Sequence, residues 1–137
     1  MLRNFLKQLF TSKSQKLTAN TSPENVVGDK TDLIGADFEF LISPSGIDIK
    51  VDDFDSIMTP GSFSWSKTTR NNWNYYQVGS DEFSYSWEIP GIQMTFNNEI
   101  KYAKAKQIAD EVVSKISNYT GQTIELIFIS KDRVISF

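Results

Sequence analysis

Four aspartates in the middle of the chain form its densest group of potential cation ligands: Asp48, Asp52, Asp53 and Asp55. Clustered carboxylates on a loop can bind calcium or magnesium. A calcium loop of the EF-hand type needs ligands at fixed offsets, a central glycine and a terminal glutamate, and this segment lacks that pattern. A metal site, a solvated strand end and an anionic contact surface for a basic partner are the three interpretations, and we expect no metal.

The sequence also limits the catalytic chemistry of this protein. It contains no histidine and no cysteine, which removes the commonest general base, the commonest metal ligand and the thiol nucleophile. Glu82 and Glu88 could form a carboxylate pair of the glycosidase kind, but any sheet offers such pairs. There is no G-x-S-x-G elbow, no P-loop and no dinucleotide fingerprint. We therefore expect no enzyme activity and no cofactor.

An aromatic segment from Arg70 to Gln77 is the second candidate site. It combines Arg, Trp and Tyr with amides, which are residue types enriched at interface hot spots. The alternative is that Trp73 and Tyr75 belong to the core and that Asn71 and Asn72 only form a hairpin turn. The residues that we expect to contact a partner are Asp48, Asp52, Asp53, Asp55, Arg70, Asn72, Trp73, Tyr76, Glu82 and Glu88.

The charge distribution indicates which kind of partner this would be. The whole chain has a formal net charge of -3, but from Glu24 to Glu99 there are 13 acids and four bases, a balance of 4 - 13 = -9. An anionic region disfavours nucleic acid and favours a cationic protein. The absence of cysteine fits a reducing compartment, so a cytoplasmic location is expected.

These residues must be positioned by one folded domain. At 137 residues, 39% of them hydrophobic, the chain can bury a core without disulfides. Residues 1-10 predict an amphipathic helix, 11-32 a polar linker, and 33-137 the domain itself. The helix is too short to cross a membrane and lacks a secretory cleavage pattern. It could pack on the domain, bind a membrane surface or bind a partner.

Alternating apolar and polar residues predict most of the sheet. The aromatic residues of the serine-spaced segments Ser62–Ser66 and Phe83–Trp87 are expected to form its inner face. The predicted strands are a hairpin over Ala36–Asp52 with its turn at Ser43–Gly46, then Phe63–Lys67, Trp73–Val78, Glu82–Ile89 and Ile92–Phe96.

The last third of the chain predicts a long helix followed by a second hairpin. Apolar residues at helical spacing run from Tyr102 to Tyr119, with an N-cap at Asn97–Asn98 and an end at Gly121. Its lysines are expected to form a solvated face. Thr123–Ile129, a central strand around Ile127, and Arg133–Phe137 form the final hairpin. The predicted fold is α+β: an antiparallel sheet of about six to eight strands packed against this helix, plus the short N-terminal amphipathic helix.

In general character, over Ala36–Phe137, the chain resembles bacterial immunity proteins of contact-dependent growth inhibition and other polymorphic toxin systems. The likeness lies in a small acidic cysteine-free domain with an anionic segment, Asp48–Asp55, and an aromatic hairpin, Arg70–Gln77. It implies that the acidic surface covers the basic active site or substrate surface of a nuclease-like toxin domain. Two other hypotheses are a membrane-peripheral adaptor tethered through residues 1-16, and a small lyase or hydrolase that uses only Asp and Glu.

Overall fold

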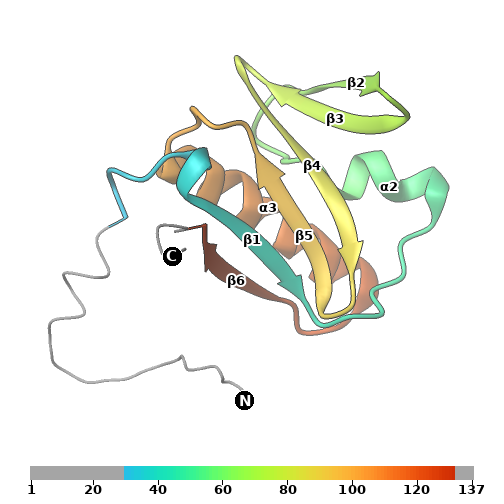
Figure 1. Ribbon diagram of the computed structural model, residues 1–137. Coiled ribbons are helices and arrows are strands. Elements are labelled where there is room, and N and C mark those ends of the chain that lie inside the picture. The colour runs from blue at the N-terminus through green and yellow to red at the C-terminus, as the bar shows by residue number, and fades with distance from the viewer. Residues whose placement is uncertain (1–29, 132–137) are drawn as a thin grey trace, which may run out of the picture. The chain divides into compact units, whose positions relative to one another are not determined.

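The computed structural model describes residues 30-131 (Figure 1), and these form an α+β fold, as predicted. One open antiparallel sheet of six strands has the order β2-β3-β4-β5-β1-β6. A long helix, α3 (Tyr102–Thr120), covers one face of it. The other elements are η1 (Gly35–Asp37), β1 (Phe38–Ser43), α2 (Val51–Ile57), β2 (Ser66–Arg70), β3 (Trp73–Val78), β4 (Asp81–Glu88), β5 (Gly91–Phe96) and β6 (Glu125–Ser130).

The core lies between the sheet and α3. Alternate residues of β1 and β5 are fully buried toward the helix, and Phe40 pairs with Met94 across these two strands. The helix contributes an apolar stripe in which Ala105 and Ala109 have no exposed surface. These small side chains let the helix backbone approach the sheet closely, while Phe38, Phe40 and other aromatic rings fill the space beside them.

The predicted helix is confirmed, but its N-terminus lies further along the chain than expected. The residue before the helix is Lys101, and Asn97 is not the N-cap. Asn97 instead accepts a hydrogen bond from the backbone N–H of Glu82 (2.9 Å) and donates one to Asp81 (2.9 Å). The asparagine therefore ties β5 to the start of β4. The predicted end is correct, because Gly121 has φ 74° and its N–H donates to Ser117 O.

The first predicted hairpin is wrong in its second arm. Ile47, Ile49 and Val51 do not form a strand; residues 47-50 are irregular and α2 begins at Val51. The physical reason is that β5 and β6 occupy both edges of β1, so no edge remains for residues 47-51. Asp52 and Asp53 lie in the first turn of α2, where negative charge is favourable.

Three other strand predictions need correction or lie outside the described residues. The strand predicted at Phe63–Lys67 is β2, which runs from Ser66 to Arg70. Phe63 lies in the loop before it and packs against the core. Within residues 30-131, β6 is an outer strand of the sheet and not a central one. Arg133–Phe137, the N-terminal helix and most of the linker fall outside the described residues, so these parts, and membrane contact through residues 1-16, remain predictions.

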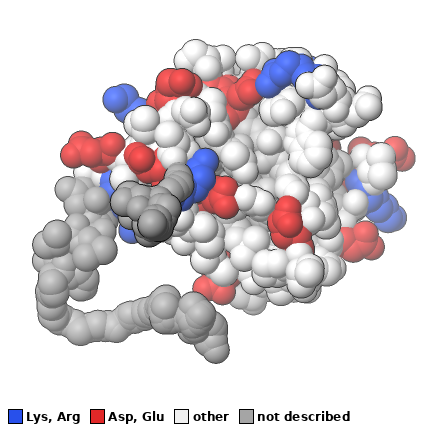
Figure 2. Space-filling model, in the orientation of Figure 1, with Lys and Arg blue, Asp and Glu red and all other residues white. Residues whose placement is uncertain are grey.

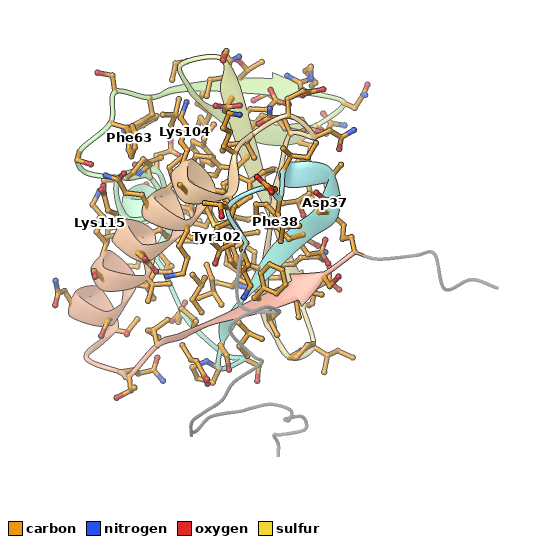
Figure 3. All side chains as sticks on the ribbon, turned by 90° about the vertical axis from the view of Figure 1, so that its left-hand side faces the viewer. Asp37, Phe38, Phe63, Tyr102, Lys104 and Lys115 are labelled. Carbon is orange, nitrogen blue, oxygen red and sulfur yellow. The ribbon has the colours of Figure 1, made fainter. Side chains whose placement is uncertain are left out.

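Two lysines of α3 do not form the solvated face that the sequence predicts (Figure 3). Lys104 donates to the carbonyl of Val78 (3.0 Å) and forms an ion pair with Asp81 (2.7 Å). Lys115 donates to the carbonyls of Ser56 and Thr59, both at 2.8 Å. Both lysines therefore hold distant chain segments against the helix. Neither helix of the described region is long and apolar enough to cross a membrane.

Candidate functional site

A cleft of about 420 Å³ opens between the segment that leads into α2 and the sheet. We call it the aromatic cleft. A smaller hollow of about 220 Å³ adjoins it and shares Phe54, Asn74 and Trp87. The lining residues of the cleft are Ile47, Asp48, Ile49, Val51, Phe54, Asp55, Lys67, Asn74 and Trp87.

The cleft exists because two neighbouring strands diverge. β3 pairs with β2 from Trp73 to Gln77, but it pairs with β4 only from Tyr76 to Val78. Figure 1 shows the β2–β3 hairpin turning away from β4. Phe54 of α2 packs into the opening, with its ring centroid 5.5 Å from that of Trp87 and 6.1 Å from that of Tyr85. Its ring centroid also lies 6.5 Å from that of Tyr76 in β3, so one helical side chain contacts both diverging strands.

Asp55 is a carboxylate in the lining of the cleft that has two side-chain partners. It accepts hydrogen bonds from Lys67 Nζ (2.7 Å) and from the Tyr76 hydroxyl (2.6 Å). Partial desolvation acts to raise the pKa of Asp55, but the bonds from Lys67 and Tyr76 outweigh it, so the pKa lies below the ordinary 3.8. Burial, aided by Asp55, raises the pKa of Tyr76. At neutral pH, Asp55 is therefore an anion paired with a cation.

This arrangement predicts a pH dependence of stability. Because the pKa of Asp55 is lower in the folded chain, its contribution is present above 3.8 and is lost as the pH falls through the folded value. Asp55→Asn should lower the free energy of unfolding by less than about 1 kcal/mol near neutral pH, because the pair is partly exposed, and the difference should vanish in acid. Urea unfolding over a pH series measures this. Glu125→Gln, at an exposed carboxylate of β6, is the control, and an equal pH-dependent loss there would contradict the assignment.

The other carboxylates near the cleft differ from Asp55. Asp48 and Asp52 are exposed, and their side chains have no hydrogen bond or ion pair with residues 30-131. Asp53 accepts a hydrogen bond from the Tyr119 hydroxyl (2.8 Å), which raises the pKa of that tyrosine. Large apolar side chains are exposed beside them, since Val51 is 89% and Trp87 is 52% exposed. Negative charge and apolar surface therefore adjoin at this site.

The structure brings together only part of the predicted set. Asp48 and Asp55 line the cleft, and Asn72, Trp73 and Tyr76 line the adjoining hollow. Tyr76 is almost fully buried, so it supports Asp55 rather than offering a contact surface. Asn71 and Asn72 have positive φ values and form the hairpin turn, whereas Trp73 is exposed and does not belong to the core.

The remaining predicted residues lie on the other face of the sheet. Arg70 forms an ion pair with Glu82 (2.7 Å) and lies 3.9 Å from the centre of the Tyr75 ring. Glu88 accepts a hydrogen bond from Ser86. Figure 2 views the sheet from the side opposite α3, and its acidic side chains are spread over this face rather than gathered. These residues form no site with the aromatic cleft.

Sequence reasoning missed several residues of the cleft. It placed Trp87 on the same face as Phe83 and Tyr85, which the pairing of Trp87 with Ile92 confirms, but Trp87 is half exposed near the end of β4 rather than buried. It gave no role to Phe54. A signal for α2 was present, because Val51 and Phe54 are three residues apart and lie on the same side of a helix.

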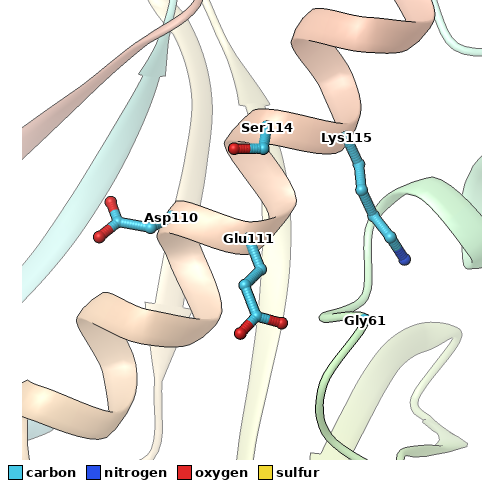
Figure 4. Close-up of a pocket in the computed structure, with 5 residues that line it drawn as sticks. All are labelled: Gly61, Asp110, Glu111, Ser114 and Lys115. Atoms are coloured by element: carbon cyan, nitrogen blue, oxygen red, sulfur yellow. The ribbon is translucent and has the colours of Figure 1, made fainter.

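A second depression lies on α3 near Gly61 (Figure 4). Its charged groups already have partners: Glu111 accepts hydrogen bonds from the backbone and hydroxyl of Ser62, Lys115 donates to two carbonyls, and Asp110 forms an ion pair with Lys106. We therefore interpret this depression as the seam that holds the loop before β2 on α3. Nowhere in the described range do three acidic side chains converge in a way that could hold a metal ion.

Comparison of the chain with protein-family models, with curated proteins and with solved structures found no match. The function is therefore inferred from the geometry of the aromatic cleft. That geometry combines the exposed apolar side chains of Val51 and Trp87 with the paired carboxylate of Asp55 and with Asp48, which has no partner among residues 30-131.

Proposed function

We propose that this protein is a non-catalytic cytoplasmic binding protein that recognises a basic protein partner through the aromatic cleft and α2. The observation that carries the proposal is the exposure of Trp87 and Val51 beside Asp48 and Asp52, whose carboxylates have no partner within the described residues. An exposed tryptophan with a charged rim is typical of an interface hot spot. Unpaired acids attract a basic partner and orient it.

The more specific form of the proposal is an immunity protein that neutralises a nuclease-like toxin by occlusion. A nuclease has a basic substrate surface because it binds phosphates. The acidic first turn of α2, with Asp52 and Asp53, is complementary in charge to such a surface. An apolar anchor beside these acids would add the burial that holds the complex together.

The state of the carboxylates supports a binding role rather than catalysis. A general acid of the glycosidase type needs a raised pKa in an apolar setting. The pKa of Asp55 is lowered, and its carboxylate is held by Lys67 and Tyr76. Glu82 is likewise bound by Arg70. Near the cleft, Asp48 and Asp52 are exposed to solvent and have no hydrogen bond or ion pair within residues 30-131, so they are free to contact a partner.

Charge reversal tests the proposed surface. Asp48→Lys combined with Asp52→Lys should weaken binding to the partner by tenfold or more and mainly slow association, because exposed charges act chiefly on encounter. The matched control is Asp110→Lys with Glu125→Lys, which changes the net charge equally at exposed positions away from the cleft. The measurement is association kinetics at low and high salt.

The first partner to test is the product of the reading frame next to this gene. Co-expression followed by co-purification, and loss of that product's toxicity when both are present, is the expected result. The proposed surface is wrong if the two double variants weaken binding equally. The immunity hypothesis is wrong if the neighbouring product is toxic and this protein neither binds nor protects.

A further inference from the structure

The aromatic cleft has a shape and charge that suit one kind of occupant. We propose that it receives a single long basic side chain of the partner, a lysine or an arginine, with the apolar stem along the walls and the cation near Asp48. This inference rests on the proposed function, because it names the group of the partner that the site binds. It also defines the cleft as the central anchor point of the surface.

The walls match the stem of such a side chain. Ile49, Val51 and Trp87 line the cleft with apolar surface, and Phe54 packs beneath Trp87. Lysine and arginine stems bury their methylene groups on surfaces of this kind while the charged end stays in a polar setting. The indole ring also attracts a cation through its π face. A short side chain would leave most of the cleft empty.

The charges of the lining residues indicate that the bound side chain ends in a cation. The cleft contains two acids, Asp48 and Asp55, and one base, Lys67. Lys67 neutralises Asp55 through a 2.7 Å ion pair, so one negative charge, that of Asp48, is left over. One added cation therefore makes the lining neutral. A partner side chain that ends in a carboxylate would be repelled by Asp48. A side chain with a neutral end would gain no electrostatic attraction from Asp48.

The direct test needs no partner protein. N-acetyl-lysine methylamide and N-acetyl-arginine methylamide are titrated into the full chain, and N-acetyl-norleucine methylamide serves as the uncharged probe of similar shape. NMR follows the backbone amides of residues 47-55 and the indole N–H of Trp87. We expect saturable shifts at these positions with a basic probe. Equal shifts with norleucine, or basic-probe shifts confined to other regions, would overturn the proposal.

Two substitutions separate the charge of Asp48 from general acidity. Asp48→Asn keeps the shape of the side chain and removes its charge. It should lower the affinity for the basic probe by about two- to fivefold, as expected for an exposed ion pair. Glu125→Gln, at an exposed carboxylate of β6 outside the lining of the cleft, should leave the affinity within experimental error. Equal weakening by the two variants contradicts the proposed position of the cation.

The two proposals fail in different ways. If the basic probes do not bind at the cleft, this inference is wrong even where the partner complex forms and depends on Asp48 and Asp52. If the probes bind as expected but the neighbouring product is neither bound nor neutralised, the immunity hypothesis is wrong and the cleft remains a receptor for basic side chains. Lysine and arginine are distinguished by the affinities of the two probes.

Discussion

Gly35→Ala is expected to destabilise the protein by about 3 kcal/mol or more, which is the largest effect of a single added methyl group in this fold. A Cβ at Gly35 would lie 1.8 Å from the carbonyl oxygen of Asn97 and 2.9 Å from its carbonyl carbon. Both are backbone atoms, so no side-chain rotation can relieve the contact. The residue is buried, and its N–H donates to Ile100 O at 2.9 Å.

The segment that meets Gly35 cannot easily move away. Asn97 binds the carbonyl of Glu82 through its N–H, and its side chain binds the Glu82 N–H. A shift of this residue would therefore break the junction of β4, β5 and α3. Urea unfolding of the variant measures the loss. The matched control is Gly61→Ala, where the nearest atom is Lys115 Cε at 3.8 Å, and there we expect a change within about 0.5 kcal/mol. A similar loss at both positions would show that the close approach is not the cause.

Trp87→Ala is expected to weaken the partner complex by about 2 kcal/mol, or roughly 30-fold in affinity. Trp87 is 52% exposed, so much of its surface is free for a partner, and it lines both the aromatic cleft and the adjoining hollow. Its ring rests on Phe54, which keeps the exposed surface in one position before binding. Removing the ring removes both the apolar wall and the preorganised contact.

The control for this variant is Trp65→Ala. Trp65 is also a partly exposed tryptophan, but it packs on Tyr76 outside the lining of the cleft. Isothermal titration with the partner should show near-normal affinity for Trp65→Ala and the loss for Trp87→Ala, with the folded state of both variants checked by thermal unfolding. If Trp65→Ala weakens the complex more than Trp87→Ala does, the interface lies elsewhere.

Two elements that were predicted correctly, β1 and α3, share one property: each has an unbroken pattern and one buried face. Phe38, Phe40 and Ile42 alternate along β1 and are buried, and the α3 stripe runs at helical spacing to Gly121. For such segments the local period and the burial in the folded chain agree, because the same apolar face must leave water in either description. The α+β class follows from these elements.

The segment from Ile47 to Val51 shows where the local pattern is insufficient. Its alternation is as regular as that of β1, but a strand also needs a free edge to pair with, and β5 and β6 occupy both edges of β1. The pairing of β1 with β6 joins residues more than 80 positions apart, such as Ile42 and Leu126. No local period carries that information.

The sequence by itself determined the chemistry that is available: carboxylates, amides and aromatic rings without histidine or cysteine. It also determined which segments carry an apolar face. Only the tertiary structure decided that Asp55 is paired with Lys67 while Asp48 has no partner in the described part of the chain, and that Phe54 packs against Trp87. The reason is that the charge and exposure of a site depend on contacts between distant residues, and these are set by strand pairing and by the divergence of β3 from β4.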